Sequence, residues 1–223
     1  GLASNKISNL CLFEDNLFIA YAEGGISTIS ISNNIKINKN PFGDIVNSYT
    51  VNDFYNYKDS LLYLATNSGV KLMYKGNFTS IGEELTNTNI SSVFCENPNS
   101  VWLGTKGEGL YSVQYHNEKE IVTNFRNNPS DLASITSDVI YDIIQDFSGS
   151  IWLTTQEGVS YFDPLKQNFN LVTNNLSGDQ MLIDKNVWSI YEENKSKVWV
   201  GNRKGISIID LNSSSSYNFP FSS

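Results

Sequence analysis

The chain has 223 residues, of which 40% are hydrophobic and 13% aromatic. That composition is too apolar for a disordered segment and is sufficient for a hydrophobic core. The net charge is −8 with only 15 Lys and Arg residues, which argues against nucleic-acid binding and against electrostatic binding to anionic membranes.

The first 38 residues contain four short apolar stretches separated by polar turns. The stretch ISNLCLF (7–13) is followed by the turn EDN, and then by LFIAY around Phe18. A turn that ends in Gly25 leads to a third stretch from Ile26, and a looser fourth stretch covers 35–37. Short apolar runs bounded by turn residues predict β-strands.

The same order of elements returns four times along the chain. Each copy opens with an apolar stretch (VNDFYNY, ISSVFCE, IYDIIQD and VWSIYEE) and continues into a short strand centred on an aromatic residue, Tyr63, Trp102, Trp152 or Trp199. Looser fourth strands are expected at 78–81, 121–125, 169–172 and 217–219. The five repeats have approximate bounds 1–38, 45–81, 85–125, 134–172 and 182–219.

The repeats share a register as well as an order. The central aromatic recurs at intervals of roughly 45 residues, a small residue follows it by two positions, and a glycine follows by six or seven. Four short strands per repeat with almost no helical periodicity predict an all-β fold, a β-propeller of four-stranded antiparallel blades. Leucine-rich, helical and sandwich architectures do not reproduce this pattern.

The position within the repeat at which the sequence begins bears on whether the propeller is complete. The opening GLASNKI resembles internal connections such as LTNTNI. We therefore expect a single propeller domain over 1–223 that is a fragment of a larger propeller. A complete ring of five blades is the alternative.

Residues 135–169, ITSDVIYDIIQDFSGSIWLTTQEGVSYFDPLKQNF, resemble a two-component regulator propeller repeat. Residues 90–113 and 187–210 match through VWLGTKGEGLYSV and VWVGNRKGISIID, whereas the first two repeats diverge with Phe18 and Tyr63 in place of Trp. The resemblance implies the periplasmic sensing region of a hybrid two-component system protein, as in gut Bacteroidetes. Its parent would be anchored in the inner membrane and carry further blades, other domains and a kinase. The implied ligand is an oligosaccharide.

One face of the repeats is the better binding candidate, because the turns between second and third strands share it with the long polar connections. Candidate ligand-binding residues in these turns are Lys106, Glu108, Gln156, Arg203 and Lys204. The adjacent cations Arg203 and Lys204 could meet a uronate or a sulfate, or could offset local acids. Each of these residues could also be an ordinary solvated turn residue.

Tyr141 and Trp188 occupy the same position, one residue into the first strand of neighbouring repeats. Flat aromatic faces stack on sugars, so the pair could form a binding platform. Packing between blades is the alternative. Trp102, Trp152 and Trp199 belong to the repeat itself and are expected in the core.

No arrangement typical of an enzyme is evident. The adjacent carboxylates Glu192 and Glu193 would point to opposite faces of a strand, and a glycosidase needs two carboxylates that face one sugar. His116 is the lone histidine and the cysteines Cys11 and Cys95 are far apart in sequence, so neither a metal site nor a disulfide framework is expected. We expect no cofactor and no catalysis in this region.

Two alternatives to ligand sensing stay open. One is a propeller scaffold for protein contacts, including formation of a homodimer. The other is a five-bladed glycan-binding or glycoside-hydrolase domain.

Overall fold

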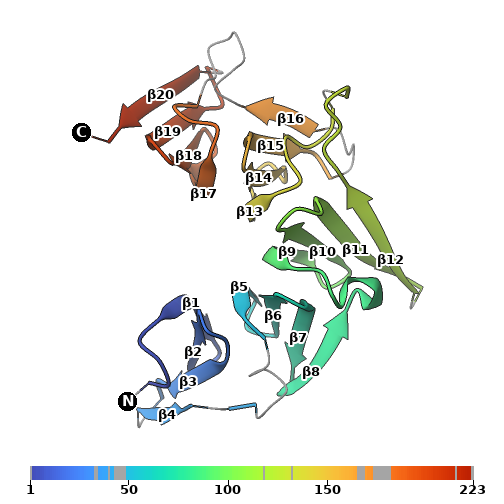
Figure 1. Cartoon of the computed structure of the whole chain (residues 1–223), viewed down its shortest axis with the longest axis vertical. Coiled ribbons are helices and arrows are strands. Elements are labelled where there is room, and N and C mark those ends of the chain that lie inside the picture. Colours follow the sequence, from blue (N-terminus) through green and yellow to red (C-terminus); the bar gives the residue numbers. More distant parts are fainter. Residues whose placement is uncertain are drawn as a thin grey trace. The chain divides into compact units, whose positions relative to one another are not determined.

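The computed structural model describes residues 2–32, 35–39, 41–42, 49–117, 119–131, 133–164, 169–172, 182–213 and 215–221. These residues form five four-stranded sheets (Figure 1). In each sheet the strands follow one another in chain order. The all-β architecture predicted from the repeat is confirmed.

The strand bounds of the first two sheets are β1 (Ile7–Phe13), β2 (Asn16–Tyr21), β3 (Ile26–Ser30) and β4 (Lys36–Asn38), then β5 (Val51–Tyr57), β6 (Leu61–Thr66), β7 (Gly69–Tyr74) and β8 (Asn77–Ile81). A short 3-10 helix, η1 (Glu83–Leu85), follows. The third sheet contains β9 (Ile90–Asn97), β10 (Ser100–Thr105), β11 (Leu110–His116) and β12 (Lys119–Phe125).

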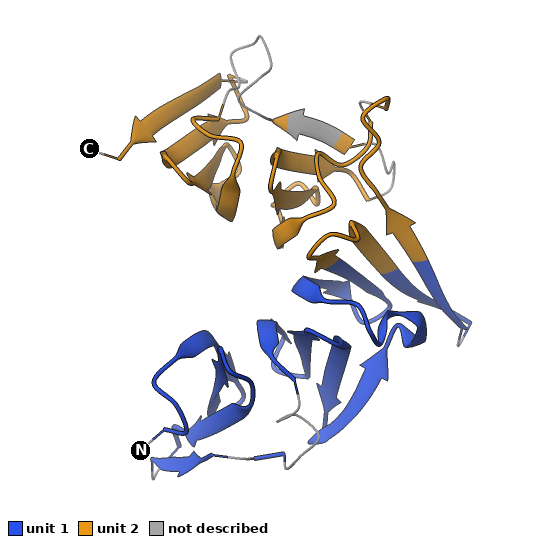
Figure 2. Ribbon diagram, in the orientation of Figure 1, with its two compact units in different colours: residues 1–103, 113–122 blue, residues 104–112, 123–223 orange. Residues whose placement is uncertain are grey.

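The fourth sheet contains β13 (Ile140–Gln145), β14 (Ile151–Thr155), β15 (Gly158–Phe162) and β16 (Phe169–Val172). The fifth contains β17 (Val187–Asn194), β18 (Lys197–Asn202), β19 (Gly205–Asp210) and β20 (Ser215–Pro220). The chain divides into two compact units, residues 1–103 with 113–122 and residues 104–112 with 123–223 (Figure 2). The third sheet contributes residues to both units, and we describe each unit by itself.

Unit 1 is held together by side chains that alternate along the strands. Phe18 and Ala20 of β2 pack into one cluster with Leu62 and Leu64 of β6. Period-two alternation places Phe18 and Ala20 on the same face of β2. Burial of these side chains is the main force that joins the first two sheets.

In unit 1, polar side chains near the start of β1 and β5 bond to the first strand of the next sheet. Ser8 Oγ donates to the Val51 carbonyl at 3.4 Å, and Asn52 Nδ2 donates to the Ile90 carbonyl at 2.6 Å. Both residues lie at an irregularity in the pairing of their strand, the mark of a β-bulge. A bulge re-aims one side chain, and here it directs that side chain to the neighbouring sheet.

Unit 2 has an equivalent core between its last two sheets. Trp152 of β14 packs with Ile190, Val198 and Val200 of the fifth sheet. Trp152 also stacks on Tyr161, with ring centroids 4.5 Å apart.

The predicted core tryptophans share a hydrogen bond to an acid six residues earlier. Trp152 Nε1 donates to Asp146 at 2.8 Å, Trp102 to Glu96 at 3.3 Å and Trp199 to Glu193 at 2.8 Å. Trp102 and Trp152 are buried, as expected. Trp199 is only partly buried, so its assignment to the core holds in part.

Both cysteines are free thiols, with Cys95 buried and Cys11 half-buried. No helix among the described residues has the length and apolar character needed to cross a membrane.

Candidate functional site

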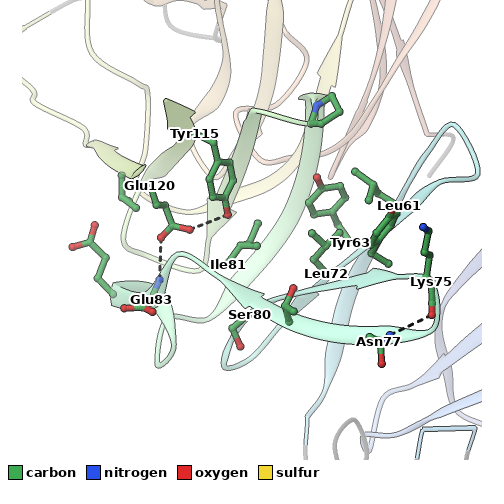
Figure 3. A pocket seen from close by; sticks show the side chains of 15 residues that line it. Leu61, Tyr63, Leu72, Lys75, Asn77, Ser80, Ile81, Glu83, Tyr115 and Glu120 are labelled. Carbon is green, nitrogen blue, oxygen red and sulfur yellow. Dashed lines mark hydrogen bonds between the residues drawn. The ribbon is translucent and has the colours of Figure 1, made fainter. Parts of the chain in front are cut away.

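A pocket of about 1010 Å³ lies within unit 1, between the second sheet and the part of the third sheet that belongs to this unit (Figure 3). None of the residues that sequence reasoning proposed for the site lines it. Its size is in the range of small-molecule and cofactor sites.

One wall of the pocket is an aromatic and aliphatic face of the second sheet. Leu61 and Tyr63 of β6 and Leu72 and Tyr74 of β7 line it. Tyr63 and Leu72 are direct cross-strand partners, and alternation along each strand brings the other two residues to the same face. Tyr63 is buried, whereas Tyr74 is 50% exposed at the outer end.

The opposite wall comes from the third sheet. Tyr115 of β11 and Glu120 and Val122 of β12 line it together with Pro98. Figure 3 shows Tyr115 and Glu120 on the side opposite Leu61, Tyr63 and Lys75.

Glu120 organises the acidic end of the pocket. Its carboxylate accepts hydrogen bonds from the Tyr115 hydroxyl at 2.8 Å, from the Gly82 amide at 3.0 Å and from the Glu83 amide at 3.2 Å. Burial and, after it, this contact with Glu120 raise the pKa of Tyr115, so the phenol stays a hydrogen-bond donor. The two amides fix the start of η1, which places Glu83 and Glu84 at the rim.

The other end of the pocket carries a cation. The Lys75 ammonium lies 5.1 Å from the centroid of the Tyr74 ring, a favourable cation–π distance. The lining thus contains three carboxylates, those of Glu83, Glu84 and Glu120, against the single ammonium of Lys75.

The position of the pocket follows from a local departure from the repeat. In the fourth sheet, Trp152 pairs across the strands with Tyr161, and their stacked rings fill the space between neighbouring sheets. The equivalent pair in the second sheet is Tyr63 and Leu72. Both side chains are smaller, so less of that space is filled. The replacement of Trp by Tyr63 was visible in the sequence and is the signal that could have led to the pocket.

The predicted aromatic pair lies in unit 2. Tyr141 and Trp188 each sit at a break in strand pairing, between Ile140 and Asp142 and between Val187 and Ser189. Trp188 is 54% exposed and Tyr141 is half-buried. Among the described residues the two rings do not stack on each other.

The equivalent positions in unit 1 are Ser8 and Asn52, which bond to the next sheet. That comparison favours a packing role for Tyr141. Trp188 is exposed, so a sugar-binding platform at Trp188 stays a prediction.

The two predicted cations face a buried acid. Arg203 Nη2 and Lys204 Nζ lie 3.2 Å and 3.6 Å from Asp184 Oδ2, and the Asp184 side chain is 3% exposed. The backbone amide of Asn186 is the main cause that lowers the pKa of Asp184, and Arg203 and Lys204 add to it. Asp184 is therefore a carboxylate at neutral pH, and the geometry favours the reading in which these cations offset a local acid.

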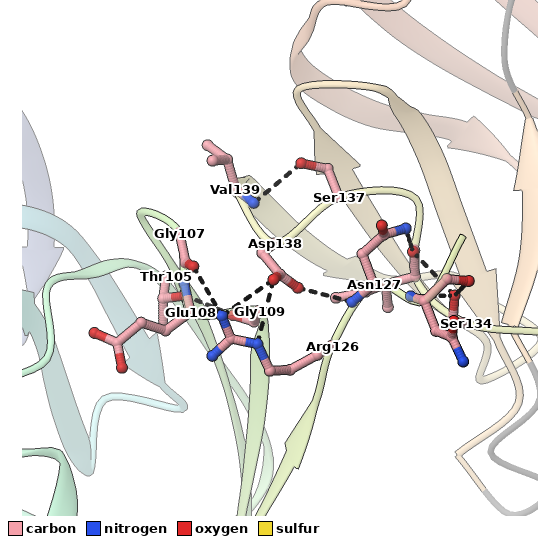
Figure 4. A network of polar contacts seen from close by, with 12 residues as sticks. Thr105, Gly107, Glu108, Gly109, Arg126, Asn127, Ser134, Ser137, Asp138 and Val139 are labelled. Carbon is pink, nitrogen blue, oxygen red and sulfur yellow. Dashed lines mark hydrogen bonds and ion pairs between the residues drawn. The ribbon is translucent and has the colours of Figure 1, made fainter. Parts of the chain in front are cut away.

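Lys106 and Glu108 belong to the β10–β11 turn, which a polar network fixes (Figure 4). Thr105 Oγ1 donates to the Gly109 carbonyl at 2.7 Å and accepts from the Glu108 amide at 2.8 Å. Arg126 Nη2 lies 3.1 Å from Asp138 Oδ2 and donates to the Gly107 carbonyl at 3.3 Å. The turn is thus tied to the connection that leads into the fourth sheet.

Lys106 and Gln156 meet at one residue. Lys106 forms an isolated β-bridge with Val139, and the Gln156 amide donates to the Val139 carbonyl at 3.2 Å. The structure therefore brings together the turns of two repeats within unit 2, as the sequence reasoning required of a shared face.

The described part of the chain contains no group of three or more His, Cys, Asp or Glu side chains arranged to hold a metal ion.

Comparison with known proteins gives structural likeness only. No family model matches the chain, and no curated protein matches it. The extracellular domain of the hybrid two component system BT4673 from B. thetaiotaomicron superposes with a TM-score of 0.75 at 17% identity, over 98% of this chain and 28% of that one.

Two further structures give the same picture. The extracellular domain of the hybrid two component system BT3049 from B. thetaiotaomicron has a TM-score of 0.55 at 15% identity, over 99% of this chain and 35% of that one. Virginiamycin B lyase from Staphylococcus aureus has a TM-score of 0.66 at 13% identity, over 98% of this chain and 71% of that one. The chain spans about a third or less of these two extracellular domains. At these identities the likeness shows the fold, which is that of four-stranded β-propeller blades.

Proposed function

We propose that this region is the extracytoplasmic ligand-sensing part of a hybrid two-component sensor, and that it recognises an oligosaccharide in the pocket of unit 1. The observation that carries the proposal is the pocket itself, which combines tyrosine walls with a rim of fixed polar groups. Apolar walls with a few oriented polar groups are typical of ligand sites. Recognition there would be relayed to a kinase elsewhere in a parent protein anchored in the inner membrane.

The fold likeness to extracellular domains of hybrid two component systems supports this role. It supports a periplasmic location and a non-catalytic region that works with further blades and domains. Tyr141 and Trp188 are a second location for the same ligand in unit 2.

The test is a calorimetric titration of the chain with plant, host and microbial oligosaccharides. We expect saturable binding that Tyr74→Ala weakens at least tenfold. Tyr217→Ala is the matched control, because Tyr217 is 55% exposed, much like Tyr74, and lies outside the pocket. Binding that is lost in Trp188→Ala and kept in Tyr74→Ala would move the site to unit 2. The proposal would be contradicted if none of the oligosaccharides bound, or if the protein cleaved a glycosidic bond.

A scaffold function has its own support in the fifth sheet. Tyr191, Trp199, Ile208 and Tyr217 form one cross-strand row, and Tyr191 and Tyr217 are largely exposed. In the fourth sheet the equivalent row contains Trp152, which is buried against the next sheet. A further blade of a longer chain would cover this face in the same way, and an exposed aromatic face can equally receive a second copy of the chain.

Light scattering over a range of protein concentrations tests the scaffold. A homodimer through this face would dissociate in Tyr191→Ser. A mass that stays monomeric at all concentrations would remove support for the scaffold and leave sensing untouched.

A further inference from the structure

The charges in the unit 1 pocket restrict which oligosaccharides it can accept. The pocket lining contains three carboxylates, those of Glu83, Glu84 and Glu120, and one cation, Lys75, and the whole chain carries a net charge of −8. Among the described residues, the carboxylates of Glu83 and Glu84 make no ion pair. Lys75 is held against the Tyr74 ring at 5.1 Å. The rim is therefore acidic without a compensating partner.

The hydrogen-bonding capacity of the rim points the same way. An ionised carboxylate is purely an acceptor with about four lone-pair sites, and Glu120 already uses three of them for Tyr115, Gly82 and Glu83. Glu83 and Glu84 keep theirs for a ligand. A molecule that fits this rim must supply hydrogen-bond donors, as sugar hydroxyls and amines do.

Anionic groups would be disfavoured at the same place. Two like charges about 6 Å apart in water disfavour each other by roughly threefold in an equilibrium constant, and by more where a site is partly buried. Two exposed carboxylates at the rim therefore predict discrimination of roughly tenfold or more against a ligand that carries a carboxylate or sulfate.

We infer that the pocket selects uncharged or amine-bearing oligosaccharides and rejects those that carry uronate or sulfate groups. The inference rests on the proposed function and assigns its ligand class. Tyr74 and Tyr115, which are both exposed in part, supply the aromatic surface on which pyranose rings would lie. The acidic rim then sorts ligands by charge.

The experiment uses backbone-matched probes with the full chain. Three series are titrated: β-1,4-glucose tetramers with their glucosamine and glucuronate counterparts, α-1,4-galactose tetramers with galacturonate tetramers, and xylotetraose with and without a glucuronate branch. In at least one series we expect the neutral or amine member to bind and the uronate member to bind at least tenfold more weakly. The difference in affinity between the neutral and the uronate member should decrease as salt is added, because exposed charges are screened.

The variant Glu83→Gln/Glu84→Gln separates charge from shape. It should raise the affinity for the uronate member relative to that for the neutral member about tenfold, because the shape of the rim is kept while its two charges are removed. Glu14→Gln/Asp15→Asn is the matched control, because it removes two exposed charges of the same unit outside the pocket and should leave the discrimination intact.

The possible outcomes are distinct. If no member of any series binds, the proposed function fails and the inference fails with it. If a uronate member binds as tightly as its neutral counterpart, the sensing function stands and the inference is wrong. Discrimination that survives in Glu83→Gln/Glu84→Gln would also overturn it, because the rim would then not be its cause.

Discussion

The Tyr115 hydroxyl donates a 2.8 Å hydrogen bond to Glu120 Oε2 across the turn between β11 and β12. The same carboxylate holds the amides of Gly82 and Glu83. A single pair of side chains thus connects the outer strands of the third sheet with the helical turn after the second sheet. The acidic rim of the pocket depends on this pair for its position.

We expect Tyr115→Phe to lower the free energy of unfolding by about 1.5 kcal/mol, the lower end for a hydrogen bond to a charged group, because Glu120 is only partly buried. Ligand affinity should fall severalfold because the rim loses one of its restraints. Urea denaturation and calorimetry measure the two effects. Tyr217→Phe, on an exposed tyrosine outside the pocket, should change neither. Unaltered stability in Tyr115→Phe would mean that the amides alone hold Glu120.

The repeat tryptophans should differ in their contribution to stability although the sequence places them in one register. Trp152 is 1% exposed and donates to Asp146, so Trp152→Ala should cost about 3–5 kcal/mol. Trp199 is partly exposed, and Trp199→Ala should cost about 1–2 kcal/mol, because less surface is returned to water. Both residues lie in unit 2, so one urea denaturation series compares them. Equal losses would show that Trp199 is covered in solution.

The repeat made the fold predictable, and its exceptions made the pocket hard to predict. The aromatic, small residue and glycine in fixed phase defined the second and third strands, because a turn glycine and a period-two strand leave local marks. The pocket depends on how Tyr63 and Leu72 of one repeat pack against Tyr115 and Glu120 of the next. No local pattern records that packing, and only the divergence at Tyr63 pointed to it.

The role of two adjacent cations stayed open in the sequence for a related physical reason. Arg203 and Lys204 stand next to each other in an acidic chain, which is compatible with an anionic ligand and with pairing to local acids. Asp184 lies about twenty residues earlier, and its burial beside both cations comes from tertiary packing. A pairing of that kind cannot be read from spacing.

Asp142 should give unit 2 a pH-dependent stability. Burial raises the pKa of this carboxyl from 3.8 to about 6, partly opposed by the amides of Ile143 and Ile190. The folded protein therefore holds the proton more tightly than the unfolded chain. The stability that protonated Asp142 contributes to the folded state is fully present below pH 3.8 and is lost as the pH rises through about 6.

Asp142→Asn removes that dependence and keeps an acceptor for the Ile143 amide. Above the folded pKa the variant should be more stable than the parent by up to about 3 kcal/mol, and below pH 4 the two should converge. Urea denaturation at a series of pH values measures the difference. Asp15→Asn, at an exposed position, should shift no part of the profile. A constant difference between Asp142→Asn and the parent at all pH values would contradict a buried titrating group.

Alanine variants of two turn glycines in unit 2 distinguish the cost of backbone strain from the cost of steric overlap. Gly109 and Gly149 have positive φ values of 81° and 90°. A side chain at Gly109 would overlap the Phe125 carbonyl oxygen, whereas one at Gly149 would meet nothing within 4 Å. Gly149→Ala should therefore cost about 1 kcal/mol, the strain of a left-handed residue. Gly109→Ala should cost this strain and a displacement of β12, about 3 kcal/mol in total. Thermal and urea denaturation of the two variants measure the gap. Equal losses of unfolding free energy in the two variants would mean that β12 shifts at Phe125 without cost. The hydrogen bonds of Arg126 and Asp138 would then not fix the turn.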